Sequence, residues 1–116
     1  MKSQTMNTMT INGYQAVIAF DPDIQMFRGE FVGLNGGADF YAADVNGLRQ
    51  EGETSLRVFL EACERRGIEP RKHFSGKFSL RVDPATHEAA GIAAAAHGQS
   101  LNQWATEAIR QAALTG

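Results

Sequence analysis

The stretch KFSLRVDP at residues 77–84 decides the fold of the C-terminal part of the chain. Its first six residues alternate between apolar and polar side chains, which is the pattern of a half-buried β-strand. The apolar face holds Phe78, Leu80 and Val82, and the polar face holds Lys77, Ser79 and Arg81. Asp83 and Pro84 then predict a helix start, because aspartate caps free backbone N–H groups and proline suits the first helical position.

Two helices are predicted after this strand. The first runs from about Pro84 to His97 and ends at Gly98, a residue type that readily takes the left-handed conformation. The second begins at the capping box Ser100-Leu101-Asn102-Gln103, where the serine and glutamine side chains each satisfy a backbone N–H group. Its apolar face carries Trp104 and Ile109. Residues 77–114 therefore read as a strand followed by two helices.

Such a module is incomplete as a single copy. At about 40 residues it is near the size below which a chain seldom folds alone, and its strand has no hairpin partner. Two antiparallel copies would pair their strands and merge their helices into one core. The dimer core would hold Phe78, Leu80, Val82, Trp104 and Ile109. The polar strand face would become a two-fold symmetric basic ribbon, which fits the major groove of B-form DNA.

The N-terminal part of the chain starts with a polar segment, residues 1–12, that we expect to be a flexible tail. Residues 14–20 and 26–34 then alternate as two strands of a hairpin. The turn between them is Asp21-Pro22-Asp23, in which proline fixes φ and aspartate bonds its own backbone.

A short third strand is predicted at residues 38–42, followed by a helix that Asp44 caps and Gly67 closes. Residues 13–68 therefore form an α+β module with a three-stranded antiparallel sheet and one helix. Residues 69–76 have no periodicity and read as a linker to the C-terminal module.

The net charge of −2 hides an asymmetry between the two modules. Residues 1–64 hold four basic and nine acidic residues, whereas residues 65–116 hold seven basic and four acidic ones. Six of those seven basic residues lie between Arg65 and Arg81. An acidic N-terminal module and a basic region where the two modules join indicate different binding partners. A series of solvent-exposed charges on an ordinary protein surface explains such a cluster equally well.

Composition disfavours several kinds of site. No stretch approaches the roughly 20 consecutive apolar residues of a membrane-spanning helix, and the start lacks a secretion signal, so we expect a cytoplasmic protein. Cys63 is the single cysteine and cannot form an internal disulfide. We expect no metal site and no cofactor, because no ligand cluster accompanies the three histidines, His73, His87 and His97.

The C-terminal pattern resembles a ribbon-helix-helix DNA-binding domain. Two of its sequence motifs resemble those of the HicB antitoxins of bacterial type II toxin–antitoxin systems. These motifs are Phe74-Ser75-Gly76-Lys77-Phe78 and Gly98-Gln99-Ser100-Leu101-Asn102. The front half is similar to the family's N-terminal domain, a partial ribonuclease-H-like fold. The similar segments are Phe20-Asp21-Pro22-Asp23, Phe27-Arg28-Gly29-Glu30 and Phe59-Leu60-Glu61-Ala62-Cys63, so the resemblance covers about residues 13–114.

The resemblance implies two roles. The N-terminal domain would neutralise a HicA-type toxin that cleaves messenger RNA. The C-terminal domain would repress the shared operon by binding operator DNA as a homodimer or a higher oligomer. Carried over by position, the base-reading side chains are Lys77, Ser79 and Arg81. A phosphate would bind the N–H groups at the start of the last helix, at Ser100, Leu101 and Asn102.

Two alternatives stay open beside this interpretation. One is a ribbon-helix-helix transcriptional regulator without a toxin partner. The other, less favoured, is a metal-dependent nuclease built from clustered carboxylates. Its candidate residues are Asp21, Asp23, Glu30, Asp39 and Asp44. Four of these five have local roles as turn or cap residues, so we expect a protein that is not an enzyme.

Overall fold

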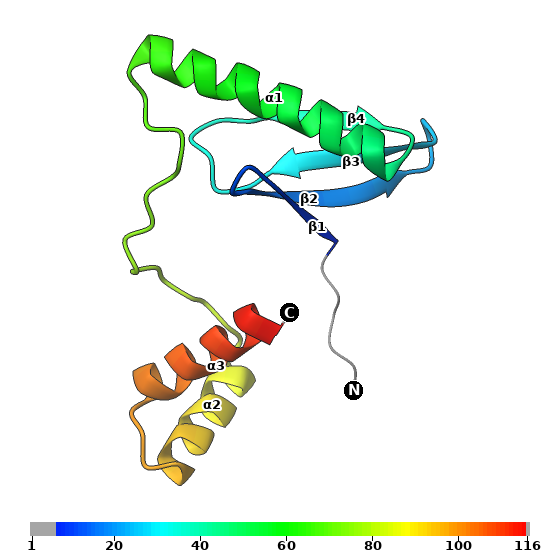
Figure 1. The fold of residues 1–116 in the computed structure, drawn as a ribbon. Helices are drawn as coiled ribbons and strands as arrows, with labels where there is room; N and C mark the ends of the chain where they lie inside the picture. The colour runs from blue at the N-terminus through cyan, green and yellow to red at the C-terminus, as the bar shows by residue number, and fades with distance from the viewer. Residues whose placement is uncertain (1–6, 116) are drawn as a thin grey trace. The chain divides into compact units, whose positions relative to one another are not determined.

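The structure, a computed structural model, describes residues 7–115 of the chain. The described residues form two compact units, the first ending at Ser75 and the second beginning at Gly76. A sheet with one helix makes up the first unit, and two helices make up the second (Figure 1). The expected α+β class is therefore confirmed.

The sheet of the first unit has four antiparallel strands in sequence order. They are β1 (Thr8–Ile11), β2 (Tyr14–Asp21), β3 (Met26–Phe31) and β4 (Asp39–Ala42). The prediction of three strands was wrong, because β1 comes from the segment that we expected to be a tail. Residues 1–6 of that predicted tail lie outside the described residues.

The missed strand has a local cause in the sequence. Ile11 pairs with Tyr14, so that Asn12 and Gly13 alone connect β1 to β2. Both residues have positive φ, 50° and 84°, as a two-residue hairpin turn of this hand requires. Asn-Gly is the strongest short-range hairpin signal, and here it stands between two apolar residues.

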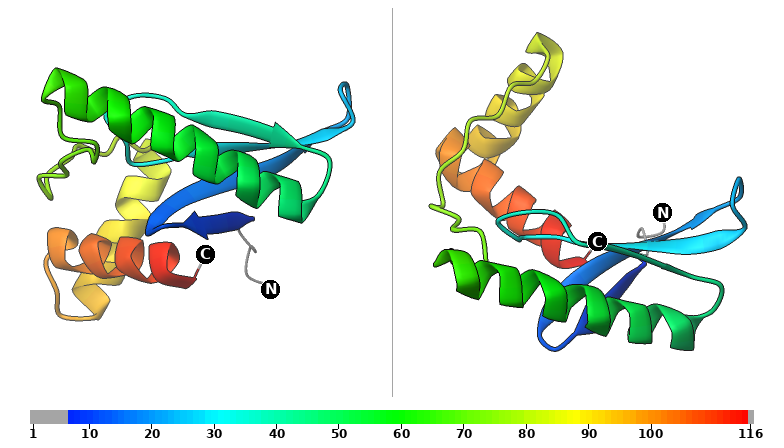
Figure 2. Two further views of the ribbon diagram at one scale, coloured as in Figure 1. Left: turned by 45° about the horizontal axis from the view of Figure 1, so that its top comes forward. Right: turned by 90° about the horizontal axis from the view of Figure 1, so that it is seen from above.

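Helix α1 (Val45–Arg66) covers one face of the sheet (Figure 2). As predicted, Asp44 caps it, accepting a hydrogen bond of 2.6 Å from the backbone N–H of Gly47, and Gly67 ends it with a φ of 65°. The core between helix and sheet includes Ile11, Ala16, Phe31, Phe40, Leu48 and Leu56. A Cβ on Gly52 would overlap with Ile11 Cδ1, so this glycine lets α1 approach the sheet.

The start of the predicted linker is hydrogen-bonded to the first unit. The N–H of Lys72 donates to the carbonyl of Gly33 at 2.8 Å, and the N–H of Asn35 donates to the carbonyl of Pro70 at 2.9 Å. The Arg71 guanidinium lies 3.9 Å from the centre of the Tyr14 ring and donates to the carbonyl of Gly13 at 3.1 Å. Residues 70–72 therefore belong structurally to the first unit.

The second unit contains α2 (Pro84–Ala96) and α3 (Leu101–Thr115). The predicted caps are confirmed: Asp83 accepts hydrogen bonds from the N–H and hydroxyl of Thr86, at 3.3 and 2.6 Å. Ser100 and Gln103 bond each other reciprocally, at 3.0 and 3.1 Å. Residues 77–82, however, form no strand. A strand needs a neighbouring strand, and neither the sheet nor the isolated bridge described within residues 7–115 includes this segment.

Candidate functional site

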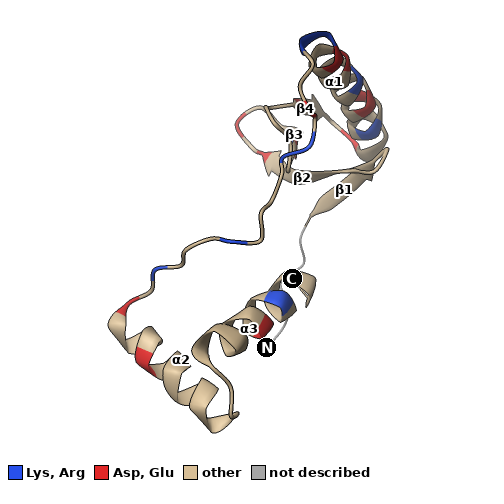
Figure 3. Ribbon diagram, turned by 90° about the vertical axis from the view of Figure 1, so that its left-hand side faces the viewer, with Lys and Arg blue, Asp and Glu red and all other residues tan. Residues whose placement is uncertain are grey.

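The residues predicted to read DNA lie in the extended segment of residues 77–82 before α2. All six side chains are exposed, the polar ones Lys77, Ser79 and Arg81 as well as the apolar ones. Figure 3 shows the lysine and arginine residues of this part of the chain as separate blue segments along the extended backbone. A solvated segment has no reason to alternate so strictly, because alternation matters only when one face becomes buried.

The predicted phosphate-binding residues lie at the start of α3. Ser100, Leu101 and Asn102 are all exposed, and the first turn of α3 contains no acidic residue. The positive end of the helix dipole is therefore uncompensated by a side chain there. The capping box satisfies the N–H groups of Ser100 and Gln103, and it fixes the helix start at Leu101.

The second unit has almost no core of its own. Among its described residues, Ala94 alone is buried. Trp104 is half-buried, and the other large apolar side chains on the two helices are exposed: Ile92, Leu101, Ile109 and Leu114. Together with the exposed Phe78, Leu80 and Val82, they leave this unit with an apolar surface that one chain does not cover.

The five candidate carboxylates do not form a metal site. Asp21 accepts a bond of 3.0 Å from the N–H of Asp23, and Asp44 caps α1. Glu30 and Asp39 face each other across β3 and β4, but both bind the guanidinium of Arg28, at 3.3 and 2.6 Å. The hydrogen bond that Arg28 donates to Asp39 is the main cause that raises the pKa of Arg28 above its ordinary value. The described residues include no group of three potential metal ligands.

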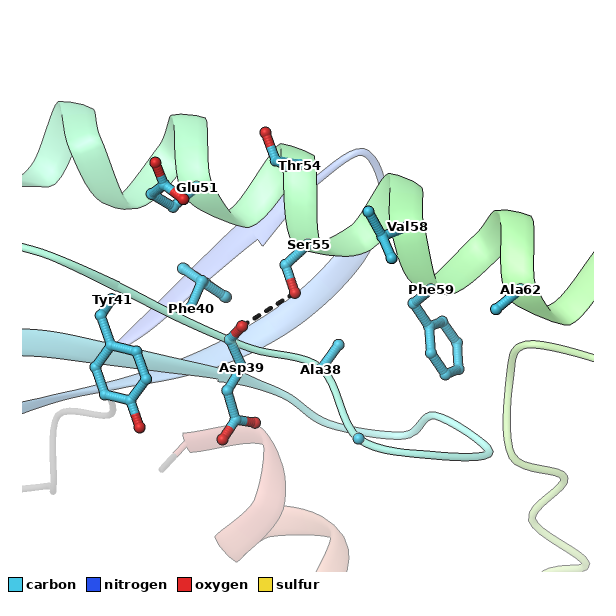
Figure 4. Close-up of a pocket in the computed structure, with 11 residues that line it drawn as sticks. Ala38, Asp39, Phe40, Tyr41, Glu51, Thr54, Ser55, Val58, Phe59 and Ala62 are labelled. Atoms are coloured by element: carbon cyan, nitrogen blue, oxygen red, sulfur yellow. Dashed lines mark hydrogen bonds between the residues drawn. The ribbon is translucent and has the colours of Figure 1, made fainter.

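A groove that was not predicted from the sequence lies between α1 and β4, with a volume of about 700 Å³ (Figure 4). Apolar side chains of Phe40, Val58 and Phe59 contribute to its walls, and Asp39 and Glu51 are its acidic lining residues. The hydroxyl of Ser55 donates to the backbone carbonyl of Asp39 at 3.1 Å. Because β4 is an edge strand, this bond occupies a backbone group that a partner strand would otherwise use.

The other sheet edge is protected in the same way. Arg49 of α1 donates to the backbone carbonyl of Thr10 in β1 at 3.2 Å. Side chains from one helix thus reach both edge strands, which disfavours sheet extension by a partner strand.

These features define a class: an α+β protein with an acidic sheet unit that has a buried core and a small helical unit whose large apolar side chains are mostly exposed. Comparison with protein-family models matches residues 59–109, from the last turns of α1 to most of α3, to the HicB family. Over these residues the chain is similar to the HicB family, a family of toxin–antitoxin system components. No curated protein and no solved structure matches it. Within residues 7–115, no helix combines the length and apolar character needed to cross a membrane.

Proposed function

We propose that this protein is an antitoxin with two activities. Its first unit binds and neutralises a small, basic, HicA-type toxin that cleaves messenger RNA. Its second unit binds operator DNA as a homodimer and represses the operon that encodes both proteins. The proposed partners place the protein in the cytoplasm.

The observation that carries this proposal is the incomplete second unit. A module in which Ala94 alone is buried among the described residues has too little core to be stable in one copy. Antiparallel pairing of residues 77–82 from two chains would form a two-stranded ribbon and cover Phe78, Leu80 and Val82. Trp104 and Ile109 would then meet their counterparts in a shared core.

The same pairing would create the DNA-binding face. Lys77, Ser79 and Arg81 would lie on the outer face of the ribbon, twice, at the right width for the major groove. Lysine and arginine donate to the acceptors on a guanine edge, whereas serine bonds several bases. The start of α3, at Ser100, Leu101 and Asn102, would anchor a phosphate, because its dipole end carries no opposing acidic side chain.

Charge supports the assignment of the toxin to the first unit. Residues 1–64 carry nine acidic and four basic residues, and a toxin that cleaves RNA must itself attract phosphates. The four strands and single covering helix support the proposed kinship of this unit to a partial ribonuclease-H-like domain. Its carboxylates, held by Arg28 or by backbone groups, favour binding over metal-dependent hydrolysis.

The test uses the full chain and the product of the neighbouring small gene. We expect the two proteins to co-purify, and we expect the complex to retard a duplex carrying the operon's promoter. A regulator without a toxin partner would bind the promoter but not the neighbouring product. A nuclease would degrade labelled RNA with magnesium or manganese, and Asp39→Ala would abolish that activity.

A further inference from the structure

One end of the first unit carries several exposed apolar side chains. We use the name hairpin end for the turn region between β2 and β3, residues 20–26, together with Asp44 and Val45 at the start of α1. Phe20 is 50% exposed and Ile24 is 49% exposed, and Val45 is also exposed. Tight turns favour glycine, proline, asparagine, aspartate and serine, so an exposed isoleucine at this position is unusual.

These two segments lie at the same end of the sheet. The rings of Phe20 and Phe27 pack edge to face with centroids 5.3 Å apart, and Phe27 is the cross-strand partner of Ala42. A Cβ on Gly47, in the first turn of α1, would lie 3.0 Å from the Cβ of Ala42. Figures 1 and 2 show the β2–β3 turn and the start of α1 together at that end in every view.

The turn is held in one conformation. Gln25 has a φ of 56°, in the left-handed region that non-glycine residues seldom occupy. Its side-chain amide donates to the carbonyl of Pro22 at 2.8 Å, and Asp21 accepts from the N–H of Asp23 at 3.0 Å. A fixed turn presents Ile24 with little conformational entropy to lose on binding.

The charge at this end has one sign. Asp21, Asp23 and Asp44 belong to the hairpin end, and residues 20–27 and 42–48 contain no lysine or arginine. The nearest cations in sequence are both committed elsewhere: Arg28 binds Asp39, and Arg49 binds the carbonyl of Thr10. Exposed apolar anchors surrounded by uncompensated carboxylates fit a basic protein surface with an apolar centre.

We propose that the hairpin end is the surface through which this chain binds its basic protein partner. This inference rests on the proposed function, in which the basic partner is the RNA-cleaving toxin. Phe20 and Ile24 act as the apolar anchors, and the three aspartates steer the approach of the partner and pair with its cations.

The two other exposed surfaces of the first unit fit a basic partner less well. On the uncovered sheet face, Arg28 already binds both Glu30 and Asp39, so these carboxylates are partly compensated. In the groove between α1 and β4, the Ser55 bond occupies the edge carbonyl of Asp39. Both surfaces nevertheless present an exposed valine, Val17 on the sheet face and Val58 in the groove, and these provide matched controls.

The experiment compares three full-length variants, Ile24→Lys, Val17→Lys and Val58→Lys. The replaced side chains are similarly exposed, at 49%, 46% and 56%, so each variant adds one cation at a comparable surface position. Affinity for the purified product of the neighbouring gene is measured by calorimetry at matched salt. We expect Ile24→Lys to weaken binding by at least about tenfold, as loss of an interface anchor does, and both controls to change it by less than about twofold.

A fourth variant, Asp23→Asn, tests the charge argument without changing packing. We expect it to slow association at low salt and to leave dissociation nearly unchanged, because a charge at the rim acts mainly on the encounter. Thermal melts of all four variants check that the first unit stays folded. If Ile24→Lys does not fold, an unchanged association rate for Asp23→Asn alone overturns the inference.

The remaining outcomes separate this inference from the proposed function. If the wild-type chain does not bind the neighbouring product, both fail together. If it binds and Val58→Lys or Val17→Lys is the variant that loses affinity, the toxin-antitoxin role stands and the hairpin end is the wrong surface. If Ile24→Lys alters only the oligomeric state of the free protein, the hairpin end is a contact between copies of this chain.

Discussion

Replacement of Phe78 by alanine is the most direct test of the proposed ribbon. Phe78 is 72% exposed in the single chain, and the proposed dimer buries it against its counterpart. Complete burial of a large apolar side chain contributes about 1.5–3 kcal/mol, so the dimer gains about 2 kcal/mol from each copy and about 4 kcal/mol from both. Loss of about 4 kcal/mol raises the dissociation constant of the dimer by about a thousandfold.

The assay is sedimentation velocity over a concentration series, combined with circular dichroism of the same samples. Because the second unit has little core, we expect Phe78→Ala to lose helical signal upon dilution at concentrations where the wild-type chain remains dimeric and helical. Phe74→Ala is the matched control. Phe74 is 74% exposed but precedes the alternating stretch, so its removal should leave the dissociation constant unchanged.

Two results would refute the reasoning. One is a wild-type chain that stays monomeric and fully helical at every concentration tested, which would show that the second unit is stable without a partner. The other is an equal effect of Phe78→Ala and Phe74→Ala, which would show that the alternation in residues 77–82 does not define a buried face.

Three further predictions concern DNA binding, packing and pH. Arg81→Ala should cost about 1–3 kcal/mol on the operator and reduce discrimination against random duplex, whereas Ser100→Ala should weaken binding to both alike, because a phosphate carries no base information. Binding titrations on both duplexes at matched salt check this pair. Gly52→Ala should lower the melting temperature of the first unit, because overpacking at Ile11 costs about 1–3 kcal/mol and exceeds the gain in helix propensity of at most about 1 kcal/mol. The hydrogen bonds from Thr86 lower the pKa of Asp83 from its ordinary value of 3.8, so its stabilisation of α2 is complete above pH 3.8 and is lost as the pH falls through the lowered folded-state pKa. An acid titration followed by circular dichroism should show a smaller loss of helix in Asp83→Asn than in the wild-type chain.

The helix boundaries could be predicted because their causes are local. Asp44, Asp83 and Ser100 each bond a backbone N–H three residues further along, so the cap and its partner are visible in one short window of sequence. The cause of the turn at Asn12 and Gly13 is equally local, because the Asn-Gly hairpin signal is present in the sequence. The polar composition around it favoured a tail, and the pairing of Ile11 with Tyr14 shows that the turn residues were the better guide.

Long-range contacts could not be predicted from the same pattern. Arg71 bonds the carbonyl of Gly13, a residue 58 positions earlier, and nothing in the basic stretch of residues 65–81 distinguishes this arginine from its neighbours. The groove between α1 and β4 depends likewise on the way the sheet and helix pack. The two faces of residues 77–82 follow from alternation alone, but whether they pair depends on a second chain. The assigned DNA-binding residues therefore stay predictions.

The contrast between the two units has a consequence for how the proposed activities combine. The first unit has its own buried core, whereas the second unit leaves most of its large apolar side chains exposed in the single chain. A dimer formed through the second unit therefore carries two complete first units, each with its own hairpin end. The proposed toxin surface and the proposed DNA-binding residues belong to separate units, so they share no residue. Under the proposed function, loss of the dimer would therefore impair repression while leaving each first unit able to bind a toxin.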